Sequence, residues 1–210
     1  MLGFLWVADG WGRQETGVMD VVTRQGELQV AADAVVDSLG LKQSLAEFGE
    51  PVRVGSSALG LMVRRDVDIT VVCPALDMAT HEAVVKLGGE LARHQRVGKV
   101  LFRNDTGDWN VDAKYPDGFY LGVGCRSAHG LEWNVDIWFV DEPARQPDLE
   151  HVRTLPGRLT DETREAILGI KEAWAERPEY GKSVSSYDIY TAVLDKGVRT
   201  PEEFEGWRSV

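Results

Sequence analysis

The chain has 210 residues and a formal net charge of −11 at pH 7, from 23 Lys and Arg against 34 Asp and Glu. This length fits one domain, or one domain with a small helical appendage. The acidic balance excludes a broad electrostatic footprint for nucleic acid, although a nucleotide arriving with magnesium needs only a local basic cluster. No run of about 18 apolar residues occurs, so we expect no membrane span. The two cysteines, Cys73 and Cys125, lack metal-site spacing, and residues 1–8 lack a basic leader and a cleavage site, which favours the cytoplasm.

The first part of the chain contains one helical pattern and one short strand. Residues 1–25 are rich in glycine and show little periodicity, which predicts an N-terminal arm. Apolar residues recurring every three or four positions predict a helix over residues 27–39. A short apolar run at residues 51–54 predicts a strand, and a helical turn is expected over residues 58–63 after a Gly-Ser-Ser turn.

Residues 66–73 form the most informative pattern in the sequence. Their β-branched residues, bounded by charge and by Pro74, predict a strand. Strand alternation puts Asp66, Asp68 and Thr70 on one face. The two carboxylates then lie roughly 6.6–6.8 Å apart along that face, close enough to share a divalent cation.

The turn before this strand has the composition of a phosphate cradle. Gly55 lets the backbone approach an anion, and the hydroxyl groups of Ser56 and Ser57, with nearby N–H groups, can donate to phosphate oxygens. A solvated surface strand explains a bare Asp-x-Asp equally well, but a Gly-Ser turn at this distance favours a site.

These residues together resemble the signature of a known superfamily. An apolar residue followed by Gly55-Ser56, nine intervening residues, and Asp66-apolar-Asp68-apolar is similar to the motif of nucleotidyltransferases related to DNA polymerase beta. The resemblance implies an α+β (α/β) fold, in which a small mixed β-sheet is flanked by helices. It also implies that two Mg²⁺ or Mn²⁺ ions are held by acidic side chains.

The middle of the chain predicts the rest of that sheet. A helix is expected over residues 79–95, followed by strands over residues 97–102, 118–126 and 131–140. Short connections favour antiparallel neighbours, so we expect a mixed sheet with helices covering one face.

Asp136 is the candidate for the third acidic residue that the superfamily places on a neighbouring strand. Its strand is strongly apolar. A lone carboxylate in such a strand is costly unless it is paired, solvated in a cleft or bound to metal. The resemblance implies that Asp136 helps to hold the metal and takes the proton from the acceptor hydroxyl. A carboxylate on the wet face of an edge strand is the alternative. Asp112 and Asp117 are rival candidates, but their Gly- and Pro-containing surroundings suit loops.

The C-terminal part is predicted to be helical. Residues 141–159 are rich in proline and indicate a crossing out of the sheet. Helices are expected over residues 160–177 and 187–196, with a last helical turn near residues 200–207. We therefore divide the chain into the arm, a catalytic core over residues 26–142 and a helical subdomain over residues 143–210.

A second, weaker resemblance lies at the start of the last long helix. Lys182 followed by Ser185-Ser186-Tyr187 is similar to a Lys and Ser-Ser-Tyr pattern of terminal uridylyl- and polyadenylate-transferases, at a shorter spacing. The resemblance implies that Lys182 and Ser186 contact the β- and γ-phosphates and that Tyr187 belongs to the nucleotide site. Helix capping explains the serines equally well. Arg65, with neighbouring basic residues, is a further candidate for phosphate contact, or else part of a solvated rim.

The function expected from these patterns is metal-dependent transfer of a nucleoside monophosphate from a nucleoside triphosphate (NTP) to a hydroxyl acceptor, with release of pyrophosphate. The acidic charge favours a small molecule or a protein as acceptor, and an RNA 3′ end, such as that of a tRNA, is the alternative. A different class remains open: a non-catalytic, nucleotide-binding or antitoxin-like module of the same fold that binds a partner protein.

Overall fold

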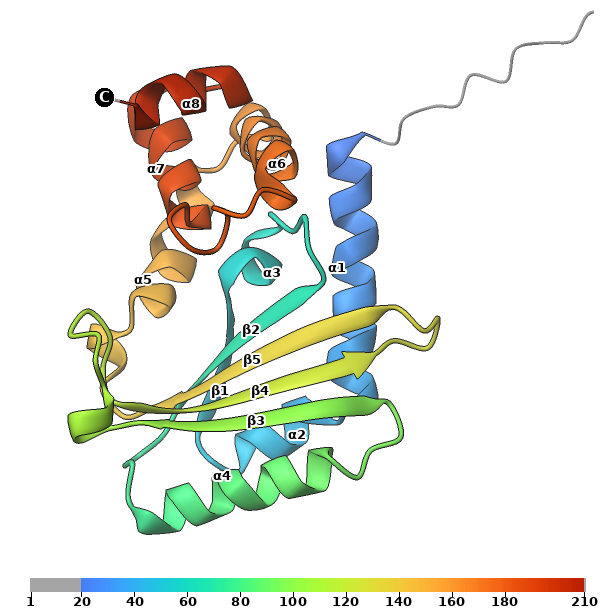
Figure 1. The fold of residues 1–210 in the computed structure, drawn as a ribbon, viewed down its shortest axis with the longest axis vertical. Coiled ribbons are helices and arrows are strands. Elements are labelled where there is room, and N and C mark those ends of the chain that lie inside the picture. The colour runs from blue at the N-terminus through green and yellow to red at the C-terminus, as the bar shows by residue number, and fades with distance from the viewer. Residues whose placement is uncertain (1–19, 210) are drawn as a thin grey trace, which may run out of the picture.

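The computed structural model describes residues 20–209, which form a five-stranded sheet and eight helices (Figure 1). The strands are β1 (Glu50–Val54), β2 (Asp66–Val72), β3 (Val97–Asp105), β4 (Gly118–Arg126) and β5 (Glu132–Val140). The helices are α1 (Val21–Ser38), α2 (Leu41–Ala46), α3 (Gly55–Leu59), α4 (Met78–Leu91), α5 (Pro147–Thr154), α6 (Asp161–Ala175), α7 (Ser186–Lys196) and α8 (Pro201–Arg208).

The sheet is mixed, as the sequence predicts. Its strand order is β1-β2-β5-β4-β3, and β2 pairs parallel with β5 while every other pair is antiparallel. The parallel pair sets Asp68 directly opposite Asp136. Because neighbouring strands lie about 4.8 Å apart, this register brings two carboxylates from distant parts of the sequence side by side.

Helices cover one face of the sheet and leave the other to the acidic residues. The apolar, odd-numbered positions of β2, β4 and β5 are buried against α1, α2 and α4 in one hydrophobic core. Strand alternation therefore sends the even-numbered positions, Asp66, Asp68 and Asp136 among them, to the opposite face. The expectation of helices on a single face is confirmed.

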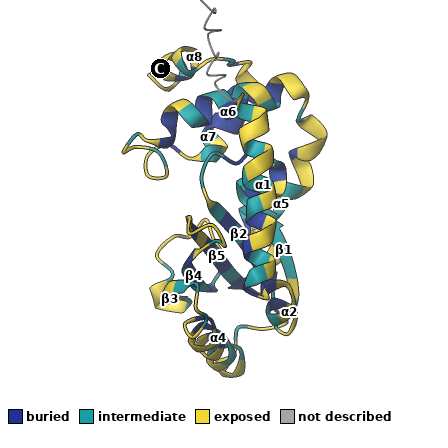
Figure 2. Cartoon of the chain, turned by 90° about the vertical axis from the view of Figure 1, so that its right-hand side faces the viewer, coloured by how far each residue is buried: buried dark blue, intermediate teal, exposed yellow. Residues whose placement is uncertain are grey.

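A second hydrophobic core holds the C-terminal helices together. Helices α6–α8, orange to red in Figure 1, gather at one end of the molecule, α5 lies between them and the sheet, and α4 lies beyond the sheet at the other end. Figure 2 shows the buried faces of α6 and α7. This core also takes in Leu59 and Leu61, which follow the Gly-Ser turn. The segment between β1 and β2 thus packs against both parts, and the expected boundary at residues 142 and 143 stays a prediction.

Several elements differ from the sequence-based expectation, which among other things did not include α2. Helix α1 begins at Val21 instead of residue 27, because the Asp20 side chain accepts hydrogen bonds from the N–H groups of Val22 and Thr23. The remainder of the expected arm, residues 1–19, lies outside the described residues. The Pro-rich crossing contains an unpredicted helix, α5, which begins with Pro147 at its first position.

Within the described part of the chain, no helix has both the length and the apolar character of a membrane span. Cys73 and Cys125 are buried free thiols. The cytoplasmic location expected from them stays a prediction.

Two leucines on adjacent strands test the first core. Leu121 on β4 is fully buried, whereas Leu101 on β3 is 43% exposed. Leu121→Ala should lower the free energy of unfolding by about 2–5 kcal/mol, through lost burial and a residual cavity. Leu101→Ala should cost less than about 1 kcal/mol. Urea denaturation at equal m-values measures both changes, and equal losses would contradict the assigned core.

Candidate active site

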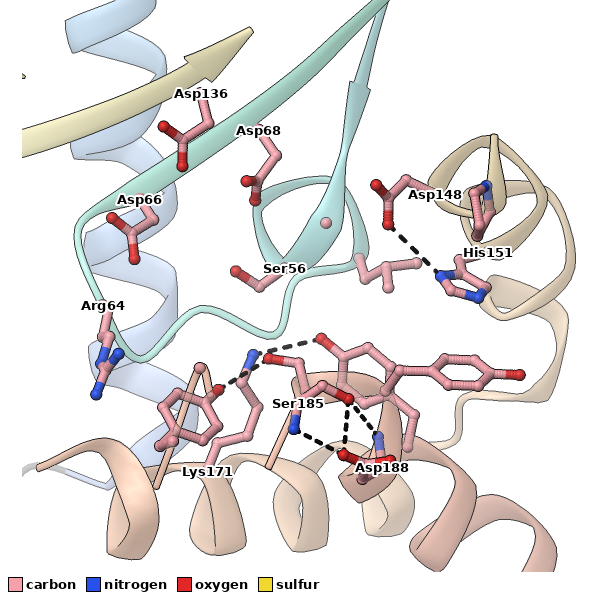
Figure 3. Close-up of a pocket in the computed structure, with 18 of the residues that line it drawn as sticks. Ser56, Arg64, Asp66, Asp68, Asp136, Asp148, His151, Lys171, Ser185 and Asp188 are labelled. Carbon is pink, nitrogen blue, oxygen red and sulfur yellow. Dashed lines mark hydrogen bonds and ion pairs between the residues drawn. The ribbon is translucent and has the colours of Figure 1, made fainter. Parts of the chain in front are cut away.

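A cavity of about 830 Å³ lies between the uncovered face of the sheet and the C-terminal helices. Its lining includes groups from α3, β2, β5, α5, α6, α7 and the loops beside them: Gly55, Ser56, Arg64, Asp66, Asp68, Lys114, Asp136, Asp148, His151, Lys171, Lys182, Ser185, Ser186, Tyr187 and Asp188. Figure 3 shows Asp66, Asp68 and Asp136 on one side, Lys171 and Ser185 on the other, and Ser56 between them. The cavity therefore brings the three predicted aspartates together with the predicted Lys182 and with Lys171, which the sequence analysis did not single out.

The three predicted aspartates converge at the cavity. Asp66 and Asp68 alternate along β2, and Asp136 lies beside Asp68 on β5. Asp66 Oδ1 accepts a hydrogen bond from Asn134 Nδ2 at 3.0 Å, and Asp136 Oδ1 accepts one from Tyr120 Oη at 2.6 Å. Each of these two carboxylates is oriented by one neutral donor on the sheet.

Gly55 makes room for the carboxylate of Asp68. Its φ of 64° is left-handed, and a Cβ at this position would overlap the Asp68 side chain. The glycine is the first residue of α3, where we predicted a turn ahead of a helix at residues 58–63. Helix α3 thus begins next to Asp68, with Ser56 lining the cavity.

The acidic residues stand in an environment that opposes full ionisation. Burial, and then the charges of Asp136 and Asp66, raise the pKa of Asp68 to about 7. Burial also raises the pKa of Asp136, against which the Tyr120 hydrogen bond acts. Like charges in a poorly solvated site are stabilised by a cation.

The donor set fits a hard divalent cation, although the side chains do not enclose one as they stand. Carboxylate oxygens are the ligands that Mg²⁺ and Mn²⁺ prefer. Among residues 20–209, no three acidic, His or Cys side chains are grouped tightly enough to hold an ion. Asn134 donates to Asp66 Oδ1 and Tyr120 donates to Asp136 Oδ1, so Oδ2 of each carboxylate is left for a ligand. A cation would be held by these remaining oxygens together with the Asp68 carboxylate.

Lys171 on α6 is a site residue that sequence reasoning missed. Its side chain is 1% exposed, and its ammonium donates to Leu61 O at 2.6 Å and Tyr190 Oη at 3.3 Å. Burial lowers the pKa of Lys171 to about 7, while the charges of Asp68 and Asp66 oppose this shift. The sequence did carry one signal for this residue: Lys171 follows Ile167 by four positions and so lies on the apolar face of a helix that we predicted to be structural.

The Ser-Ser-Tyr segment contributes to the cavity, with its roles divided differently from the prediction. Ser185 caps α7, because its hydroxyl accepts from Asp188 N and the Asp188 carboxylate accepts from Ser185 N. Ser186 lies in the first helical turn, and its hydroxyl pairs with Tyr180 Oη at 2.8 Å. Lys182 and Tyr187 also line the cavity. The capping alternative therefore holds for Ser185, and the phosphate contact expected of Ser186 stays a prediction.

Helix α5 adds a pair that the sequence did not indicate. His151 stacks on Tyr187 with ring centroids 4.2 Å apart, and its Nδ1 lies 3.8 Å from Asp148 Oδ1. Burial raises the pKa of Asp148. Because we read this segment as an irregular crossing, neither residue could be placed at the cavity.

Two predicted phosphate-binding residues lie outside the cavity. Ser57 is 2% exposed, and its hydroxyl accepts from Arg53 Nε at 3.0 Å, because the helical turn of α3 points it toward β1. Arg65 is exposed, and its neighbour Arg64, in the bend before β2, lines the cavity instead. Neither Ser57 nor Arg65 is among the residues that line the cavity.

The rival carboxylates have loop roles, as expected. Asp117 accepts hydrogen bonds from Gly107 N and Asn110 Nδ2, which lowers the pKa of this carboxyl. Asp112 accepts from Lys114 N in a turn. Neither residue lines the cavity.

No family model and no curated protein matches the sequence. Among solved structures, the chain is similar to Cid1 in complex with its short product ApU, with a TM-score of 0.55 and 15% identity over 86% of this chain and 55% of that one. A second structure, on the RNA terminal uridylyl transferase activity of Cid1, gives a TM-score of 0.53 and 18% identity over 81% of this chain and 46% of that one. The chain spans about half the length of these proteins. The likeness shows that it has the nucleotidyltransferase fold.

The raised pKa of Asp68 predicts how stability depends on pH without metal. The folded protein holds this proton up to about pH 7, whereas the ordinary value is 3.8. Between these values the folded state binds more protons, so the free energy of unfolding should fall as pH rises from about 4 to 7. Asp68→Asn should flatten this fall and stabilise the protein at pH 7.5 by a few kcal/mol, since one pKa unit corresponds to about 1.4 kcal/mol.

Denaturation in EDTA at pH 5 and pH 7.5 measures the effect, with Asp112→Asn as the matched control in an exposed turn. Identical pH dependence in Asp68→Asn and the unaltered protein would contradict the buried, crowded site.

Proposed function

We propose that this chain transfers a nucleoside monophosphate from an NTP to a hydroxyl acceptor. The observation that carries the proposal is the meeting of Asp66, Asp68 and Asp136 in a cavity whose opposite wall bears a buried lysine. Anionic and cationic groups on facing walls suit a ligand that brings both metal ions and phosphates. The nucleotidyltransferase fold supports the same reaction class.

The acidic residues have two tasks in this proposal. Asp66 and Asp68 would hold the divalent ions, and Asp136 would share this role and take the proton of the acceptor hydroxyl. The acceptor oxygen then forms a bond to the α-phosphorus as the bond to pyrophosphate breaks. Bound Mg²⁺ or Mn²⁺ would supply charge stabilisation for the attacking and leaving oxygens. No Ser, Cys or His nucleophile is required.

The facing wall suits the triphosphate. Lys171, Lys182 and Arg64 line the same cavity and can neutralise phosphate oxygens, and the Ser56 and Ser186 hydroxyls can donate to them. Tyr187 offers an aromatic ring for stacking against a base. Lys171, whose ammonium is already directed by Leu61 O and Tyr190 Oη, would meet phosphate with little loss of side-chain entropy.

The acceptor in our proposal is a small molecule or a protein. The net charge of −11 disfavours a long polyanion, because phosphate contacts dominate nucleic-acid affinity. An RNA 3′ end is the alternative acceptor.

The reaction is tested with the four α-labelled NTPs, Mg²⁺ and three acceptor pools: hydroxylated small molecules, protein and short RNA. We expect label transfer with one or more NTPs, only with metal, and its loss in Asp68→Asn. Calorimetry should show that metal strengthens triphosphate binding and that Asp68→Asn removes this gain. Nucleotide binding without transfer in any pool would instead support the non-catalytic alternative, and equal metal-dependent binding by the variant would refute the metal assignment.

Lys182 tests the phosphate wall. If Lys182 contacts the β- and γ-phosphates, Lys182→Ala should weaken the binding of all four triphosphates to a similar extent. The expected loss of binding free energy is of the order of 1.5–3 kcal/mol, as for a charge-assisted contact. Monophosphate affinity should hardly change. Lys196, in the last turn of α7, provides the control as Lys196→Ala. A loss that depends on the base would show that Lys182 reads the nucleobase instead.

A further inference from the structure

Tyr120 on β4 connects the outer strands to the proposed active site. Its hydroxyl donates to Asp136 Oδ1 at 2.6 Å, across the β4–β5 pair. In the register of that pair, however, Asp136 lies opposite Gly122, two positions further along β4. The tyrosine side chain therefore crosses over Gly122 to reach the carboxylate.

Gly122 is what permits this crossing. A Cβ built on Gly122 would lie 2.5 Å from Tyr120 Oη, closer than real Cβ atoms come to another heavy atom, and 3.0 Å from Tyr120 Cζ. Because the atom in the way is the end of the tyrosine side chain, an added methyl group should shift the Tyr120 hydroxyl from its place beside Asp136. The glycine and the hydrogen bond thus form a single structural unit.

The ring of Tyr120 is held from its other sides. In the strand register, Tyr120 on β4 has Arg103 of β3 beside it on one side and Trp138 of β5 on the other. The Arg103 guanidinium lies 4.8 Å from the Tyr120 ring and 5.3 Å from the Trp138 ring, and the two rings are 5.0 Å apart. Asp105 fixes the guanidinium by accepting from Arg103 Nε at 2.8 Å. The tyrosine is packed in place before any ligand arrives.

We propose that Tyr120 is the positioning residue of Asp136, and that Gly122 is present so that it can act. The proposal rests on the function proposed above and adds the group that orients its base. Because Tyr120 takes Oδ1, Asp136 presents Oδ2 to the acceptor hydroxyl. A fixed carboxylate accepts a proton at a defined place, and misplacement by about 1 Å can cost a hundredfold in rate.

Paired variants test the proposal. Tyr120→Phe removes only the hydroxyl, and Gly122→Ala displaces it. Each should lower kcat about tenfold or more, with the NTP KM changed less than about twofold, because Asp136 acts on the acceptor. The double variant should lose no more than either single one, because both break the same contact. Gly98→Ala is the control, since a Cβ on this β3 glycine meets nothing within 4 Å.

A second readout needs neither turnover nor metal. In protein labelled at tyrosine Cζ, the NMR signal that Tyr120→Phe abolishes should shift in Asp136→Asn and in Gly122→Ala, and stay in place in Gly98→Ala. An unmoved signal in Asp136→Asn would overturn the contact, and an unmoved signal in Gly122→Ala would overturn the role of Gly122. With an active enzyme, an unchanged kcat in Tyr120→Phe would overturn the positioning role and leave the proposed function standing. If the unaltered protein shows no transfer, the proposed function and with it the role of Tyr120 in catalysis fall.

Discussion

The structure depends on one costly arrangement, the parallel pairing of β2 with β5 that sets Asp68 beside Asp136. Like charges on adjacent strands destabilise a sheet unless something compensates for them. Here burial against α3 makes the repulsion stronger, and it raises the pKa of Asp68 to about 7. A cation bound between these carboxylates would relieve their repulsion and so stabilise the folded state.

The segment between β1 and β2 links that arrangement to the rest of the chain. Gly55 brings α3 against Asp68, and Leu59 and Leu61 then enter the core of the C-terminal helices. Leu61 also supplies the carbonyl that receives the Lys171 ammonium. One short stretch thus contacts both the acidic wall and the basic wall of the cavity.

Sequence reasoning recovered what depends on local periodicity. Strand alternation placed Asp66 and Asp68 on one face, and the apolar pattern of β5 singled out Asp136. The mixed sheet with one covered face followed from the same periods. Lys171, Tyr120 and His151 could not be found, because each contributes through partners distant in sequence. Ser57 was misplaced because it turns toward β1 within α3, a geometry that a Gly-Ser-Ser motif does not specify.

The central claim is that the three aspartates bind divalent metal together with a triphosphate. It is tested most directly by a crystal structure with Mn²⁺ and a non-hydrolysable NTP, in which anomalous scattering locates the ions. We expect Mn²⁺ between the carboxylates of Asp66, Asp68 and Asp136, with the phosphates directed toward Lys171. Anomalous peaks elsewhere, or a triphosphate bound away from these residues, would contradict it.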